Sequence, residues 1–164
     1  MPTIVATPSA TNANSYATLA QLVEFAETVT SVGSFATADQ ARREAALIEA
    51  TRLIDRTDFE GIRTVDAQAL KWPRRDVYSR EYPCRALDST VIPTGLVNAC
   101  CWLAIKLLNS DPMSSEQSQG YQSIKIGDFQ AVFNGASKPP SHPADEALGT
   151  YFRDYLMPDR ALRG

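Results

Sequence analysis

The chain has 164 residues, which is about the length of one domain. Its 44% hydrophobic and 21% charged residues are ordinary values for a globular protein. Its net charge of −3 argues against a dedicated nucleic-acid clamp but leaves room for a local basic patch. The longest apolar run, Leu96–Leu108, is too short for a membrane span and contains Asn98 and Lys106. The three cysteines and the lack of a secretory signal favour synthesis in a reducing, intracellular compartment.

Residues 1–14 are rich in Thr, Ala, Asn and Pro, so we expect an extended N-terminal arm that is ordered only if something holds it. Thr18 and Gln21 have the spacing of a capping box, which predicts a helix from Thr18 to about Thr30. A helical core domain is expected to span residues 15–110.

A second capping box, Thr37 to Gln40, predicts the start of a central helix that extends to about Thr57. One face of this helix is apolar, and the other combines charged residues with a stripe of small residues and Ile48. The second stripe is interpreted either as packing within the chain's own core or as a subunit contact. The sequence alone leaves both open.

A long connection without regular structure follows, up to about Val91, and such loops are usually functional or held by partners. It contains Lys71-Trp72-Pro73-Arg74-Arg75, a basic stretch around an aromatic residue. Aromatic stacking with Arg and Lys is how proteins hold single strands, so Lys71, Trp72, Arg74 and Arg75 are the candidate DNA-binding residues. Carboxylates nearby in the sequence reduce the net positive charge around this stretch. We therefore favour a Trp72 that anchors the core, with solvent-facing arginines.

Pro93 suits the first turn of a third helix, which is apolar nearly all the way round. So small a domain has difficulty covering such a helix on all sides, and we expect oligomerisation to supply the cover. The candidate subunit-interface residues are Ile48, Trp72, Arg74, Arg75 and Trp102.

Residues 111–142 are expected to form a polar linker that contains a β-hairpin over 123–133, turning at Gly127-Asp128. Residues 143–164 are expected to form a closing helix and tail. In this helix, Leu148, Tyr151, Phe152 and Tyr155 recur at helical spacing, so we expect them to dock into a groove on a partner. The expected fold is therefore mainly α, a small bundle of about four helices with a C-terminal hairpin and extended terminal arms.

No catalytic, cofactor or metal site is expected. The single histidine, His142, lies in the linker without metal-ligand spacing around it. Asp55, Asp58 and Glu60 stand among arginines, which is typical of a solvated helix end rather than a cation site. Gly-rich phosphate-binding motifs are absent. We expect a protein that is not an enzyme.

Several segments follow one another in a set order along the chain: Asn14–Leu19, the Ala46–Asp55 helix followed by Trp72-Pro73-Arg74, Ile92-Pro93, the third helix, Ile126-Gly127-Asp128 and Tyr151–Leu156. In this order they resemble a family of tailed-bacteriophage head-to-tail connector (adaptor, head-completion) proteins, also catalogued as DnaT-like single-stranded-DNA-binding proteins. The resemblance covers about residues 14–157, and its most specific part is the Ala46–Asp55 helix with Trp72-Pro73-Arg74.

The resemblance implies a structural virion protein at the neck, made in the host cytoplasm. It implies a homo-oligomeric ring, a dodecamer in this family, beneath the portal protein. The partners would be the portal, a tail or stopper protein, and DNA that passes through the channel without sequence-specific contacts. No membrane partner is expected. The alternative is a DnaT-like single-stranded-DNA-binding protein of phage replication.

Overall fold

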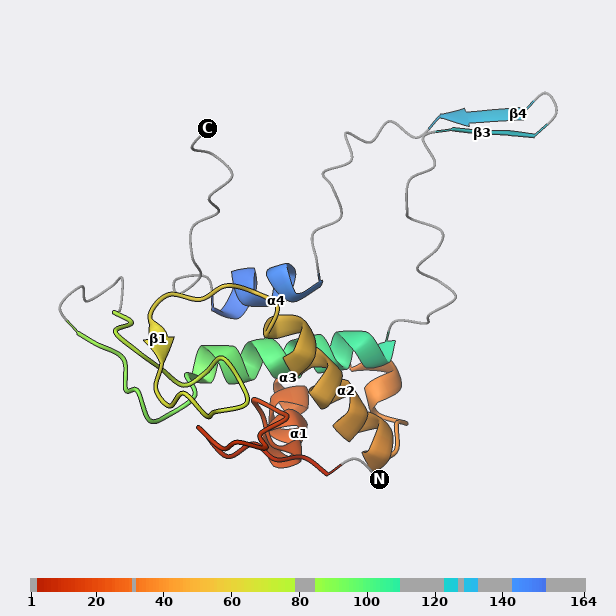
Figure 1. The fold of residues 1–164 in the computed structure, drawn as a ribbon. Coiled ribbons are helices and arrows are strands. Elements are labelled where there is room, and N and C mark those ends of the chain that lie inside the picture. Colours follow the sequence, from red (N-terminus) through yellow and green to blue (C-terminus); the bar gives the residue numbers. More distant parts are fainter. Residues whose placement is uncertain are drawn as a thin grey trace, which may run out of the picture.

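The computed structural model describes residues 3–30, 32–78, 85–109, 123–126, 129–132 and 143–152. Its four α-helices are α1 (Leu19–Thr28), α2 (Gln40–Ile54), α3 (Thr94–Asn109) and α4 (Pro143–Tyr151), with a short 3-10 helix, η1 (Gly33–Phe35) (Figure 1). Two antiparallel strand pairs are β1 (Ile62–Arg63) with β2 (Arg74–Arg75), and β3 (Ser123–Ile126) with β4 (Phe129–Val132). The expected mainly α fold with a C-terminal hairpin is confirmed. The expected turn of that hairpin, Gly127-Asp128, lies outside the described residues.

Helix α3 is the centre of the core, because α1, α2, α4 and η1 all pack against it (Figure 1). Its fully or nearly buried residues are Leu96, Val97, Ala99, Cys100, Cys101, Leu103, Ala104 and Ile105. The expectation that neighbouring subunits must cover this helix is therefore wrong. One chain supplies the cover, since short helices approach α3 from several sides.

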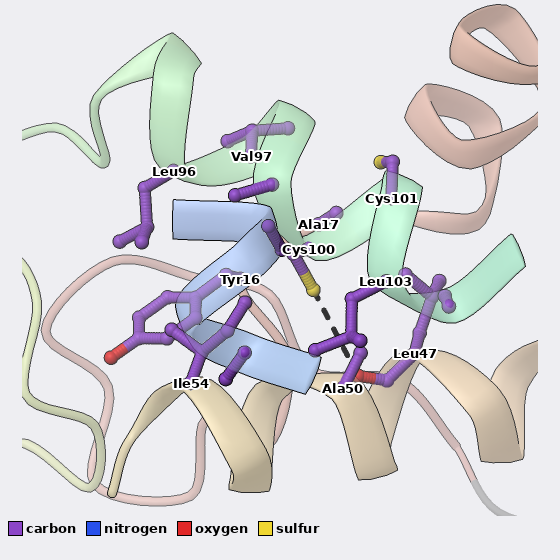
Figure 2. Close-up of a cluster of buried hydrophobic side chains, with 14 of the residues drawn as sticks. Tyr16, Ala17, Leu47, Ala50, Ile54, Leu96, Val97, Cys100, Cys101 and Leu103 are labelled. Atoms are coloured by element: carbon purple, nitrogen blue, oxygen red, sulfur yellow. Dashed lines mark hydrogen bonds between the residues drawn. The ribbon is translucent and has the colours of Figure 1, made fainter. Parts of the chain in front are cut away.

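Cys100 shows how closely α2 and α3 pack. Figure 2 shows its side chain pointing from α3 toward Leu47 and Ala50 of α2. Its sulfur lies 3.4 Å from the Thr51 hydroxyl and 3.9 Å from the Leu47 carbonyl oxygen. Burial raises the pKa of Cys100 to about 11. The thiol is therefore a packed, unreactive group, as its apolar setting in the sequence indicates.

The sequence predicts the start of α1 correctly and the start of α2 incorrectly. The Thr18 capping box forms: Gln21 N donates to Thr18 Oγ1 at 3.2 Å, and Thr18 N donates to Gln21 Oε1 at 2.8 Å. Helix α2 instead begins at Gln40, because Asp39 Oδ1 accepts from Arg42 N at 2.8 Å. The Thr37 hydroxyl donates instead to the Ser34 carbonyl. The helix ends at Ile54, before the expected Thr57. The predicted Thr37 cap is thus wrong by two residues.

The N-terminal arm is held by its own chain. Asn14 Oδ1 accepts from Val5 N at 2.8 Å, and Asn14 N donates to the Val5 carbonyl at 2.9 Å. Farther along, Ala69 N donates to the Ala10 carbonyl at 3.1 Å, which fastens the arm to the loop before α3. No partner is needed to order residues 3–14.

Helix α4 lies directly on α3. The approach is so close that a Cβ on Gly95 would stand 2.4 Å from the Tyr151 carbonyl oxygen. Leu148 and Phe152 are buried in the chain's own core, so they do not form a free docking face. Tyr151 is half-buried against Phe25, with ring centroids 5.8 Å apart, while Tyr155 lies outside the described residues. The apolar stripe of this helix was predicted correctly, but its partner is α3.

Trp102, a candidate interface residue, is half-buried between Tyr151 and Lys106. Its ring centroid lies 6.4 Å from that of Tyr151, and the Lys106 ammonium stands 4.7 Å over it. Ile48 on α2 is also half-buried. Among the described helices, none is long and apolar enough to cross a membrane.

Candidate nucleic-acid interface

The connection between α2 and α3 has a defined structure, which we call the loop layer (residues 57–78 and 85–92). Strand β1 pairs with β2, placing Ile62 opposite Arg75 and Arg63 opposite Arg74. The segment after β2 pairs in turn with residues 86–87, since Leu87 N donates to the Val77 carbonyl at 2.9 Å. These three short segments are therefore hydrogen-bonded side by side.

Trp72 anchors this layer in the core. Its side chain is 1% exposed and contacts Phe59 and Phe152 edge to face, with centroids 5.9 and 5.3 Å apart. Its backbone N donates to the Tyr16 hydroxyl at 3.3 Å, and its peptide bond to Pro73 is cis. The anchor interpretation is confirmed. Because the indole faces inward, it is open neither to a stacked base nor to a neighbouring subunit.

Arg74 holds the loop together from inside. Its guanidinium donates to the carbonyls of Glu60 at 2.6 Å, Phe59 at 3.1 Å and Lys71 at 3.3 Å, and also to that of Gly61. Burial is the main cause that lowers the pKa of Arg74. The expectation of solvent-facing arginines is therefore wrong for Arg74, which is half-buried and bonded to backbone carbonyls, and confirmed for the exposed Arg75. Its planar set of donors matches several converging carbonyls, which no other side chain satisfies as well.

Lys71 is also engaged within the chain. Its ammonium donates to the Thr57 carbonyl at 2.8 Å and lies 3.3 Å from the Asp58 carboxylate. Of the four predicted DNA-binding residues, Arg75 alone is exposed and lacks a polar partner among the described residues. The basic motif in the sequence is thus mostly a structural clamp.

The side chains that the loop layer exposes to solvent, which we call its outer face, are a different set of groups. Tyr78 is 51% exposed and is the one exposed aromatic ring among residues 3–30, 32–78, 85–109 and 144–152. Tyr78 is paired with Ala86, whose neighbour Arg85 is exposed, and Arg75 is exposed on β2. Arg63 is also exposed, but alternation along β1 puts it on the opposite side of the ribbon from the pair Ile62 and Arg75. Exposed aliphatic side chains complete the face: Ile62, Val65 and Val91.

Sequence reasoning missed Arg63, Arg85 and Ile62 as candidates. Strands β1 and β2 have two residues each, too few to give a periodic signal. The distribution of arginines along the sequence could have pointed to this region. Residues 1–41 contain no Lys or Arg, whereas every arginine among the described residues lies between Arg42 and Arg85.

The loop layer is not strongly basic. It holds five cations (Arg63, Lys71, Arg74, Arg75, Arg85) and five carboxylates (Asp58, Glu60, Asp66, Asp76, Asp88), so its formal charge is zero. Hydrogen bonds from Thr90 occupy Asp88 and lower the pKa of that carboxyl. The face can therefore hold an anionic chain only through local contacts, with stacking on Tyr78 and individual guanidinium–phosphate pairs.

No cluster of His, Cys, Asp or Glu suited to a metal ion occurs within the described ranges. A family model described as "Putative DnaT-like ssDNA binding protein" matches residues 1–163. No curated protein and no solved structure matches the chain. Since the family match covers nearly the whole sequence, the chain belongs to this DnaT-like family.

Proposed function

We propose that the protein binds single-stranded DNA through the outer face of the loop layer. The observation that carries the proposal is the exposed Tyr78 ring, together with exposed arginines on the segments paired beside it. Membership in the DnaT-like family supports the same function. A flat aromatic ring accepts any base, so this arrangement predicts binding without strong sequence preference.

In the proposed complex, one base stacks on Tyr78 and the flanking phosphates contact Arg75 and Arg85. Guanidinium groups suit phosphates because they donate two parallel hydrogen bonds. The cross-strand pair Ile62 and Arg75 lies on one face of the β1–β2 ribbon, so an apolar contact to a sugar stands beside a cation. The buried Trp72 and the internal Arg74 contribute indirectly, by keeping this face rigid.

The test is fluorescence anisotropy with a labelled oligothymidine at low salt. We expect Tyr78→Ala to weaken binding by about 5- to 150-fold, which corresponds to the loss of one stacked base, about 1–3 kcal/mol. Arg75→Gln should weaken it as well and reduce its salt dependence. Arg42→Gln is the control, because Arg42 is an exposed arginine on α2 outside the loop layer. A wild-type chain that binds no oligonucleotide at low salt refutes the proposal, and so does equal affinity of all three variants.

A second candidate function is the head-to-tail connector of a tailed phage, located at the virion neck and assembled as a ring on the portal. It rests on the ordered resemblance from Asn14 to Leu156 and on a net charge of −3, which suits a channel along which DNA slides. No comparison supports it, and the burial of α3 within one chain removes the argument from a missing cover. Of the residues expected to dock on the portal, Tyr151 keeps half-exposed surface.

The connector candidate is tested by native mass spectrometry of the chain alone and with purified portal protein. A ring of the chain, or a stoichiometric portal complex, would support it. A monomer in both samples would exclude it. The removal of residues 153–164 is the suitable tail variant, because a longer deletion also removes buried residues of α4.

A further inference from the structure

A groove of about 540 Å³ lies between the N-terminal arm and α2. Ala13 of the arm, Ile48 of α2 and Leu70 of the loop layer give it an apolar lining. Arg52 and Arg56 also line it, one helical turn apart. The volume is in the range of pockets that hold small organic ligands.

Asp55 and Asn14, which also line the groove, are bonded within the chain, and the Asp55 carboxylate offsets part of the charge of the two arginines. Asp55 Oδ1 accepts from Lys71 N at 3.1 Å and from the Tyr16 hydroxyl. The Asn14 side-chain amide accepts from Val5 N and donates to the Thr3 carbonyl at 2.9 Å. Ligand binding in this groove would therefore depend on the two arginines and the apolar lining.

The two guanidinium groups are available. Arg56 is exposed and has no ion pair among the described residues. The Arg52 side chain is 71% exposed, and its pair with Glu49, at 3.5 Å, is a surface pair of the kind that contributes little to stability. A groove with cationic donors and an apolar lining is complementary to an anion that carries an apolar body.

The groove adjoins the loop layer. Leu70 belongs to both, and Lys71, the next residue, is bonded through its backbone to Asp55 in the groove. The groove is thus contiguous with the loop layer at Leu70, and its lining includes no residue of the acidic α1, which carries Glu24 and Glu27 and no cation. This continuity favours one extended anionic ligand over two separate ones.

We propose that the groove is a second nucleotide subsite for the same single strand, with a phosphate on Arg52 and Arg56 and a sugar or base on Ile48 and Leu70. This inference rests on the proposed function. It adds a direction to it: the strand runs from the Tyr78 face toward the end of the N-terminal arm.

The experiment compares wild type, Arg56→Gln and Arg52→Gln/Arg56→Gln on labelled oligothymidines of roughly four and roughly twelve nucleotides. A short strand fills the loop layer alone, and a long one also reaches the groove. We expect the double variant to lose about tenfold in affinity for the long strand and little for the short one. Its salt slope on the long strand should fall by about 0.7, the contribution of one lost phosphate contact.

Arg42→Gln is the matched control, since it removes the same charge from the same helix outside this groove. Thermal melts should match wild type for all these variants because the arginines are exposed. If the groove variants behave like Arg42→Gln at both lengths, the groove proposal is overturned. The proposed function then still stands if Tyr78→Ala loses binding. If wild type binds neither strand, both proposals fall.

Discussion

Tyr16 is the residue that joins three parts of the chain. Its hydroxyl donates to Asp55 at the end of α2 and accepts from Trp72 N in the loop layer, while its backbone N donates to Thr51 Oγ1 at 3.1 Å. Burial is the main cause that raises the pKa of Tyr16, and the Asp55 carboxylate adds to it. Such a buried, fully bonded hydroxyl stabilises the arrangement only while it keeps its proton.

Alkaline pH should therefore destabilise the protein, and Cys100 allows a quantitative test. Its pKa rises from 9.0 to about 11 on folding, so the unfolded chain loses this proton first as pH increases. Stability is fully present below pH 9.0 and falls as pH approaches 11, by about 2–3 kcal/mol at 1.36 kcal/mol per pKa unit. Urea unfolding at pH 8 and pH 11 measures this loss. Cys100→Ala should show a smaller loss than wild type, and an identical loss in both would contradict the assignment.

Gly61 lets β1 turn toward β2. Its φ is +75°, and a Cβ there would stand 2.4 Å from the Arg75 carbonyl oxygen and 2.5 Å from Val77 Cγ2. Gly61→Ala should therefore displace β2, lower stability by about 1–2 kcal/mol and weaken DNA binding through Arg75.

The control for that substitution is Gly149→Ala. Gly149 is exposed on α4, and a Cβ at this position would have no neighbouring atom within 4 Å. Alanine there should leave binding unchanged and raise stability slightly, because it is the better helix former. Chemical denaturation and anisotropy of both variants provide the measurement. If Gly61→Ala is as stable and as active as Gly149→Ala, the backbone of the loop layer is not constrained by Gly61.

At the scale of elements, α4 changes what a C-terminal deletion should do. The docking hypothesis expects a chain without residues 134–164 to stay folded. Because Ala147, Leu148 and Phe152 are buried against the chain's own core, we now expect that deletion to unfold the protein. Phe152→Ala alone should cost about 3–5 kcal/mol. Removal of residues 153–164 should leave the melting temperature close to that of the full chain. Equal melting of the 134–164 deletion and the full chain would show that α4 is dispensable.

Which elements could be predicted from the sequence depended on how local their causes are. The Thr18 cap and the α3 helix follow from nearby residues, and both are present. The start of α2 was misplaced because Thr37 and Gln40 have the right spacing, yet Asp39 is the residue that reaches a free backbone N–H. An apolar stripe predicts that a helix face is buried, but its periodicity carries no information on which surface buries it.

The candidate site was predictable to the same limited extent. A Trp before Pro indicated an anchored loop, and Trp72 is anchored. The role of Arg74 depends on carbonyls from residues 59–61, which tertiary structure alone brings to it. The exposed face around Tyr78 depends on pairing between segments that are eight or more residues apart. No short sequence pattern encodes that pairing.

At the scale of the molecule, the arginines lie in one part of the sequence, whereas the core is built from helices along the chain. All arginines of the described residues belong to α2 and the segment up to Arg85, while α1 is acidic. The acidic α1 should therefore repel an anionic chain more than the formally neutral loop layer does. Few phosphates can be contacted, so a modest salt slope is expected rather than the steep one of a basic clamp.

The core, by contrast, closes within one chain, and this gives the last prediction. Helices α1, α2 and α4 cover α3 without a second copy, so folding should not require assembly. The melting temperature of the full chain should stay constant over a roughly hundredfold range of protein concentration, measured by differential scanning fluorimetry. A ring whose subunits complete one another's cores would melt at higher temperature as concentration rises, because association stabilises the folded state by mass action. A midpoint that rises with concentration would restore the interpretation that neighbouring subunits cover α3, and it would favour the connector candidate. A constant midpoint would mean that any ring is built from already folded monomers.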